Sequence, residues 1–285
     1  MKKHAILKKI AVVVSMLLFG ILVVGTVIAF ENSSKVSSAL NAQTFEIVNN
    51  EDSDADTEYY KSEYSKLGDL INAGAKKTEE VMSEGAVLLK NDSNALPLPE
   101  TARNVSVFGT TSADPVYGGT GSGSVATAQA VTLTKGFEDA GLVMNPTLKE
   151  NYSSRDVWYS STYRRSSKGW GGSGGRSIND VPWDVVDEAA GSTFADYSDA
   201  AIYVVGRIGG EGSDLNSKSL DGIDNNDGLG KDYLGLNANE RSMLQGLSEA
   251  RESGEFDRLI VIINSASPLE MEWLDDYKVD SVLWV

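Results

Sequence analysis

The hydrophobic pattern begins with one long uninterrupted run near the amino terminus. Residues 10–30 contain no charged side chain. As a helix this run would extend about 31 Å, close to the roughly 30 Å hydrocarbon core of a bilayer. Lysines precede the run and Glu31 follows it, so the positive-inside rule places the amino end in the cytoplasm. The pattern predicts that residues 1–30 are a short cytoplasmic lysine segment and a single-pass anchor in the cell membrane, with the remaining chain extracellular.

A cleaved signal peptide is the alternative for residues 1–30. Residues 27–29 have the small-residue spacing of a cleavage site. The apolar run is longer than the usual core of a signal peptide, which favours the uncleaved anchor. Both interpretations predict that the rest of the chain is exported.

Residues 31–57 combine a serine cluster with an acidic run that starts at Glu51. This composition predicts a disordered acidic spacer between the membrane and a folded domain. Residues 58–285 are predicted to form that domain.

Short apolar runs alternate with helical patterns along residues 58–285. Residues 104–108, 200–205, 259–263 and 279–285 have the pattern of buried strands, and the runs at 200–205 and 259–263 are continuously apolar. Helical spacing occurs at residues 59–84, 131–140, 183–190, 237–253 and 268–277. The helix at 237–253 has a capping residue, Asn237, with Glu240 three positions later and Gly254 at its end. The alternation predicts an α/β fold, a mostly parallel sheet with helices on both faces (an α/β sandwich).

The last apolar run ends with the chain itself, at Val285. No covering element follows it in this sequence. We therefore expect a sandwich that is incomplete at its C-terminus and a chain that is the N-terminal part of a longer protein.

Charge narrows the choice of partner. The formal net charge is −16, from 25 basic and 41 acidic residues. Residues 1–30 hold four of the lysines and no acid, so the exported part carries 21 basic against 41 acidic residues. An acidic surface repels polyanions, which argues against nucleic-acid binding and suits a neutral substrate.

The absence of two residue types limits the chemistry. The chain has no cysteine, and its one histidine is His4, before the apolar run. A thiol nucleophile, a Ser-His-Asp triad and histidine-bound zinc are thereby excluded from the exported part. Catalysis there would depend on carboxylates, Lys, Tyr or Arg, and we expect no cofactor.

Two loops resemble binding motifs without matching them. The glycine-rich residues 118–125 lack the GxGxxG spacing and a following lysine, so they do not predict a nucleotide site. The acidic cluster at 221–227 lacks the spacing of a calcium loop, and we expect no metal there.

The candidate site follows the apolar run at 200–205, where a glycine-rich loop carries Glu211. In open α/β sheets, ligands bind beyond the carboxyl ends of such strands. Glu211 is therefore a candidate for chemistry, although a solvated surface glutamate has the same local pattern. Arg207, four residues earlier, is a candidate substrate-binding residue or one half of an ordinary salt bridge.

Aromatic side chains mark a second candidate surface. Trp158, Tyr163 and Trp170 lie in a Ser/Gly/Arg-rich stretch, residues 151–182, that predicts a long loop. Such rings can stack on a sugar, which makes Trp170 a candidate substrate-binding residue. They can equally pin a long loop to the domain.

Four segments together resemble one known family. They are residues 84–98 (EGAVLLKNDSNALPL), 104–109 with the loop at 118–125, 204–215 (VVGRIGGEGSDL) and 233–247 (YLGLNANERSMLQGL). Their order and spacing are similar to those of the α/β sandwich domain of glycoside hydrolase family 3, which includes β-glucosidases. The resemblance covers roughly residues 65–285.

This resemblance implies a glycoside hydrolase that cleaves terminal non-reducing β-D-glycosidic bonds, β-glucosidic ones first, by the retaining double displacement. Glu211 takes the place of the family's general acid/base, and Asp214 is expected to brace its loop at the substrate. The resemblance also implies a (β/α)8 barrel that supplies the nucleophile. No barrel precedes the domain here, so we expect a domain-reversed member with its barrel C-terminal to Val285, and little activity from this chain alone.

A protein of another class remains open. The chain could be a surface sugar-binding or partner-docking module without catalysis. For the glycoside hydrolase, the expected substrate is an oligosaccharide or β-glucoside.

Overall fold

The computed structural model describes the amino-terminal helix and most of the predicted domain at residues 58–285. The described residues are 2–33, 62–119, 122, 125, 127, 130–154, 158, 180–209, 234–265 and 267–285. They fall into two units, Met1–Ser65 and Lys66–Val285. The predicted spacer lies almost wholly outside the described residues and stays a prediction.

The first unit contains one helix, α1 (Lys2–Glu31), within its described residues. The segment Lys8–Glu31 has a mean hydropathy of 2.8 and is long and apolar enough to cross a membrane. A signal sequence meets the same criteria of length and composition. The helix is therefore confirmed, while the anchor and its orientation stay predictions.

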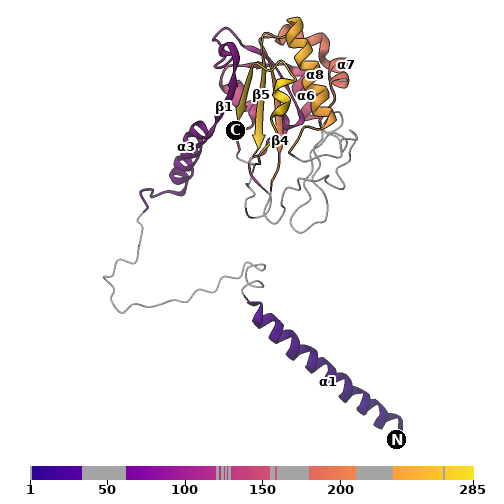
Figure 1. Ribbon diagram of the computed structural model, residues 1–285. Coiled ribbons are helices and arrows are strands. Elements are labelled where there is room, and N and C mark those ends of the chain that lie inside the picture. Colours follow the sequence, from indigo (N-terminus) through magenta and orange to yellow (C-terminus); the bar gives the residue numbers. More distant parts are fainter. Residues whose placement is uncertain are drawn as a thin grey trace. The chain divides into compact units, whose positions relative to one another are not determined.

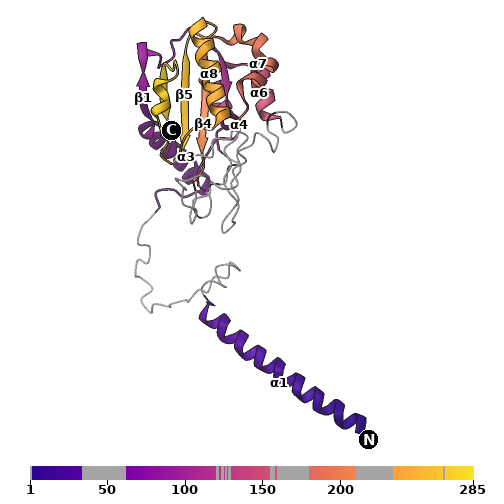
Figure 2. The ribbon, with the colours of Figure 1, turned by 45° about the vertical axis from the view of Figure 1, so that its right-hand side comes forward.

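The second unit is built on a six-stranded sheet of order β1-β6-β5-β4-β2-β3 (Figures 1 and 2). The strands are β1 (Val87–Asn91), β2 (Asn104–Phe108), β3 (Val143–Met144), β4 (Ala200–Arg207), β5 (Leu259–Ser265) and β6 (Ser281–Trp284). Only β1 runs antiparallel to its neighbour, β6, and the other four pairings are parallel. The predicted mostly parallel sheet is confirmed.

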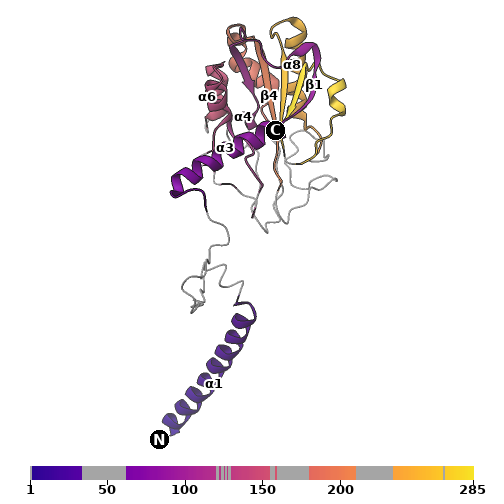
Figure 3. The same cartoon turned by 90° about the vertical axis from the view of Figure 1, so that its left-hand side faces the viewer.

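Helices accompany the strands in the alternating order that the sequence predicts. They are α3 (Leu67–Gly85), α4 (Thr110–Ala113), α5 (Leu133–Asp139), α6 (Pro146–Ser153), α7 (Trp183–Ala190) and α8 (Ala238–Ser253). In Figures 2 and 3, β1 lies toward one side of the sheet and α6 toward the other. The helix predicted at 183–190 has those bounds in the structure.

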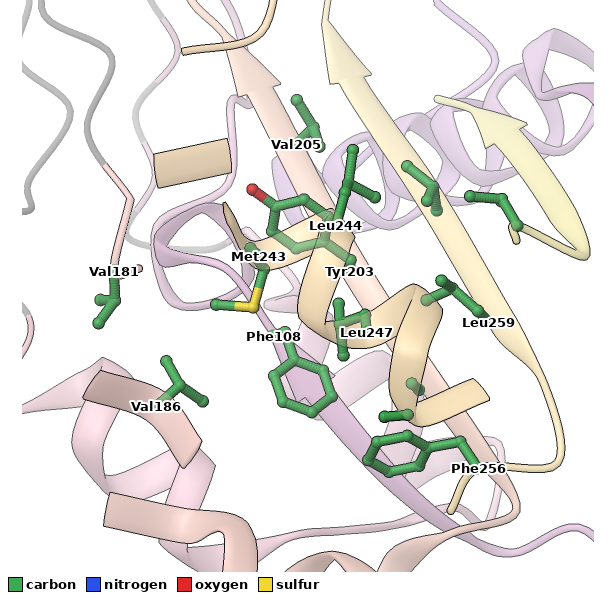
Figure 4. Close-up of a cluster of buried hydrophobic side chains, with 14 of the residues drawn as sticks. Phe108, Val181, Val186, Tyr203, Val205, Met243, Leu244, Leu247, Phe256 and Leu259 are labelled. Carbon is green, nitrogen blue, oxygen red and sulfur yellow. The ribbon is translucent and has the colours of Figure 1, made fainter. Parts of the chain in front are cut away.

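The larger core lies on the face of the sheet that α7 and α8 cover. Side chains of α8, including Met243, Leu244 and Leu247, point toward Phe108 and Tyr203 of the strands (Figure 4). All five are fully buried. Burial of this apolar surface, at roughly 25 cal/mol per Å², is the main force that joins the helices to the sheet.

The opposite face carries a second, smaller core. Alternate residues of β4 point to it, and Ile202 and Val204 pack there with Val107 of β2. Leu133 and Phe137 of α5 pack against this cluster. Because side chains alternate along a strand, β4 contributes to both cores and is buried at all eight positions.

The edge strand β1 and the helix that precedes it in the chain, α3, leave apolar side chains exposed. The helical prediction for 59–84 is confirmed, although the helix begins at Leu67 among the described residues. None of its residues is buried. Val87, Leu88 and Leu89 of β1 are about half exposed, at 51%, 48% and 47%.

One predicted helix is wrong. Residues 268–277 form only a short 3-10 turn, Glu272–Asp275. The backbone N–H of Glu270 donates to the carbonyl oxygen of Leu234, 2.9 Å away, instead of joining a helical ladder. Leu269 and Trp273 are both buried, so their four-residue spacing imitates a helical face while serving an irregular segment.

Candidate active site

The site is built at the carboxyl edge of the parallel strands. β2, β4 and β5 run in the same direction and end at Phe108, Arg207 and Ser265. Gly109 follows β2 with φ +95, and a Cβ there would lie 2.6 Å from the carbonyl oxygen of Val204. Glycine therefore allows the chain to turn closely against β4 as it leaves the sheet.

Arg207 is the last residue of β4, and its side chain is completely buried. Its Nη1 and Nη2 donate to the two carboxylate oxygens of Glu240, at 2.7 and 2.9 Å. Nη2 also donates to the carbonyl oxygen of Gly235 at 2.7 Å. These contacts form a salt bridge, which is one of the two roles that the sequence left open for Arg207. Substrate contact by Arg207 remains untested.

Glu240 is held in place by the start of α8. The Asn237 side chain accepts from the Glu240 backbone N–H at 2.8 Å, and Glu240 Oε2 accepts from the Asn237 N–H at 2.9 Å. This is the capping box that the sequence predicts. One carboxylate thus caps the helix and pairs with Arg207.

Asp180 is the second buried carboxyl group at this edge. Its Oδ1 accepts from the backbone N–H groups of Thr110 and Val181 at 3.1 and 2.8 Å, and its Oδ2 accepts from the Tyr203 hydroxyl at 2.8 Å. Burial, reinforced by the negative charge of Glu240, raises its pKa from 3.8 to about 7, against the opposing effect of these hydrogen bonds. A carboxyl that titrates near neutrality at a strand edge is typical of functional sites, but also of structural networks.

Two tyrosines surround Asp180. Burial raises the pKa of Tyr203 and of Tyr152 well above 10, and the charge of Asp180 raises both further. Tyr152 packs edge-on against Trp158, with ring centroids 4.7 Å apart. Trp158 is 3% exposed, so this aromatic residue is part of the core.

Asn264, in β5, binds a segment that follows β2 to the carboxyl edge of the parallel strands. Its side chain accepts from the backbone N–H of Val116 and donates to the carbonyl oxygen of the same residue at 3.2 Å. Nearby, Ser265 and Ser267 exchange hydrogen bonds at 2.8 and 3.0 Å. The chain that follows β2 is thus tied to the end of β5.

Residues 86–285 match the model of the Glycosyl hydrolase family 3 C-terminal domain. The chain belongs to this family. The family 3 match begins at residue 86, one residue before β1, and includes every strand of the sheet. It therefore confirms the resemblance predicted from the four segments.

Relatives and solved structures agree with the family. The chain is 29% identical to the β-glucosidase of Ruminococcus albus over 219 residues, covering 75% of this chain and 20% of the relative. It is 28% identical to β-glucosidase A of Butyrivibrio fibrisolvens over 233 residues, covering 76% and 26%. The structure of β-glucosidase 3B from Thermotoga neapolitana in complex with glucose has a TM-score of 0.57 at 26% identity, covering 75% of this chain and 27% of that one.

A novel β-glucosidase from Paenibacillus barengoltzii is also similar, with a TM-score of 0.52 at 26% identity, covering 74% of this chain and 21% of that chain. The chain thus spans about a fifth to a quarter of the length of these relatives.

Three of the predicted site residues, Glu211, Asp214 and Trp170, lie outside the described residues. The acidic cluster at 221–227 lies there too. Among the residues that the structure describes, no group of three or more His, Asp or Glu side chains could hold a metal ion.

Sequence reasoning missed most of the buried polar groups at this edge. Asp180 stands in the segment read as a loop, and its partner Tyr203 is 23 residues away. Asn264 and Val116 are 148 residues apart. No local pattern links such pairs. The one available signal was Glu240, which the capping box already singled out.

Proposed function

We propose that the protein containing this chain hydrolyses terminal β-D-glucosidic bonds with retention of configuration, and that Glu211 is its general acid/base. The observation that carries the proposal is the family 3 match over residues 86–285, which includes Glu211. Relatives named β-glucosidase support the substrate class. In the sequence Glu211 also follows the end of β4 by four residues, and open α/β sheets bind ligands beyond the carboxyl ends of such strands.

The chemistry needs two carboxyl groups about 5–5.5 Å apart. In the first step the nucleophile attacks the anomeric carbon, while the protonated Glu211 gives its proton to the departing glycosidic oxygen. In the second step the ionised Glu211 takes a proton from water, whose oxygen attacks the same carbon and releases the nucleophile. The proposal places the nucleophile outside residues 1–285, in the barrel that the family resemblance implies.

The test replaces Glu211 by Gln in the protein encoded by the complete gene. General acid/base catalysis contributes about 10²–10⁴-fold, so kcat/KM for an unactivated glucoside such as cellobiose should fall by about that factor. A dinitrophenyl glucoside, whose leaving group needs no proton, should retain its first step. The matched control is Glu188→Gln on the exposed side of α7, which should leave both rates unchanged.

Two outcomes would contradict the proposal. The first is a wild-type protein that hydrolyses no β-glucoside. The second is a Glu211→Gln variant that hydrolyses cellobiose at the wild-type rate, which would remove Glu211 from the mechanism.

A further inference from the structure

The Arg207–Glu240 pair joins the end of β4 to the first turn of α8. Arg207 is the last residue of β4, and its side chain reaches the carbonyl oxygen of Gly235, 28 residues later. The same guanidinium binds Glu240 in the first turn of α8 through both carboxylate oxygens. One side chain therefore ties together the two ends of the segment 208–235, which contains Glu211.

The geometry of the pair is more demanding than charge pairing alone requires. A guanidinium fork against a carboxylate forms two parallel, directional hydrogen bonds, which a lysine ammonium cannot reproduce. Nη1 also donates to the carbonyl oxygen of Gly206 at 2.9 Å. Two of these partners are fixed in turn, Gly206 by β4 and Glu240 by its capping box with Asn237.

A contribution to folding stability is a weak explanation for the buried Arg207–Glu240 pair. The side chains of Arg207 and Glu240 are 0% and 3% exposed. Removing both charges from water is costly, and well-packed apolar residues of similar volume often stabilise a fold as well as a buried ion pair does. What apolar residues do not supply is a fixed direction between strand end and helix start.

We infer that Arg207 and Glu240 are positioning residues for Glu211. The inference rests on the proposed function. By joining the end of β4 to Gly235 and to α8, the pair fixes both ends of the segment that carries the acid/base and so limits where its carboxyl group can be placed. In this role Arg207 acts through Glu211.

The test uses the protein encoded by the complete gene and compares two substitutions of the same kind. Arg207→Lys keeps the charge but loses the fork. Arg251→Lys is the control, because Arg251 binds Asp280 at 2.7 Å beside the first residue of β5, at the opposite edge of the sheet. A double variant, Arg207→Met with Glu240→Met, removes the buried charges together and guards against misfolding.

The readout is the ratio of kcat/KM for cellobiose to kcat/KM for dinitrophenyl glucoside. A misplaced acid slows only the substrate whose leaving group needs a proton, whereas general damage to the fold slows both. We expect the ratio to fall at least tenfold in Arg207→Lys and in the double variant, and to stay unchanged in Arg251→Lys. An equal loss on both substrates, or no loss, overturns the inference.

Hydrogen–deuterium exchange gives a readout that needs no activity. In the double variant, peptides that contain residues 206–209 and 234–240 should exchange at least tenfold faster, while β5 keeps its protection. Unchanged exchange at those ends overturns the inference. If Glu211→Gln leaves the cellobiose rate unchanged, the proposed function fails, whereas an effect of Glu211→Gln without any effect of the pair removes only the positioning role.

Discussion

Asp180 should make the stability of the domain depend on pH in an unusual direction. Its pKa in the folded state is about 7, above the ordinary value of 3.8. Between these values the folded state keeps a proton that the unfolded state releases. The free energy of unfolding must then decrease as the pH rises from about 4 to about 7, and stay constant with respect to this group outside that range.

The size of the effect follows from the shift. About three pH units at about 1.4 kcal/mol each give a loss of at most about 4 kcal/mol between pH 4 and pH 8. Asp180→Asn removes the titration but keeps an oxygen that can accept from Thr110 and Val181, and an amide that can donate to the Tyr203 hydroxyl. The variant should therefore fold, and it should become more stable relative to wild type as the pH rises.

Urea unfolding of the full chain, followed by tryptophan fluorescence at half-unit steps from pH 4 to pH 8, measures this difference. Asp276→Asn, on an exposed aspartate, is the control and should run parallel to wild type. If wild type and Asp180→Asn show the same pH dependence, then Asp180 does not hold its proton in the folded state and the account of the buried polar edge is wrong.

Two further predictions concern packing and the membrane. Gly246→Ala should destabilise the domain by about 1–3 kcal/mol in urea unfolding, because a Cβ there would lie 2.1 Å from the Trp183 ring, and this clash outweighs the helix preference of alanine. Gly136→Ala is the control: a Cβ there would have no atom within 4 Å, so the variant should be neutral or stabilising. Equal effects at both sites would contradict this packing. If α1 is an anchor, the intact chain should stay in the membrane pellet after alkaline carbonate extraction. Release of a shorter chain, with the mass expected for a first residue of Phe30, would show a cleaved signal peptide instead.

Most of the sheet and its helices could be predicted because local pattern and tertiary environment agree there. The run at 200–205 is apolar because β4 is buried on both faces, and the helix at 237–253 carries its own end signals. The strand continues to Arg207, two residues beyond the apolar run, because an ion pair buries what the pattern counts as polar. Hydrophobicity alone cannot reveal such compensation.

The failures have the same origin. The segment 268–277 has helical spacing, but its backbone bonds to Leu234, far away in the sequence. The raised pKa of Asp180 arises from its burial, and its hydrogen-bond partners Thr110, Tyr203 and Asn239 come from three separate elements, α4, β4 and α8, that no single window of the sequence contains. Glu211 could be proposed from its position after a strand and from the family resemblance, and it stays a prediction.

The stereochemistry of an azide product tests the role of Glu211 most directly. In the Glu211→Gln variant of the complete protein, a dinitrophenyl glucoside should still form the glycosyl-enzyme, and azide, which needs no general base, should then attack it. Proton NMR should show β-glucosyl azide from the variant and little or none from wild type. Absence of this product, or the α anomer, would contradict the assignment of Glu211 as the acid/base of a retaining glycosidase.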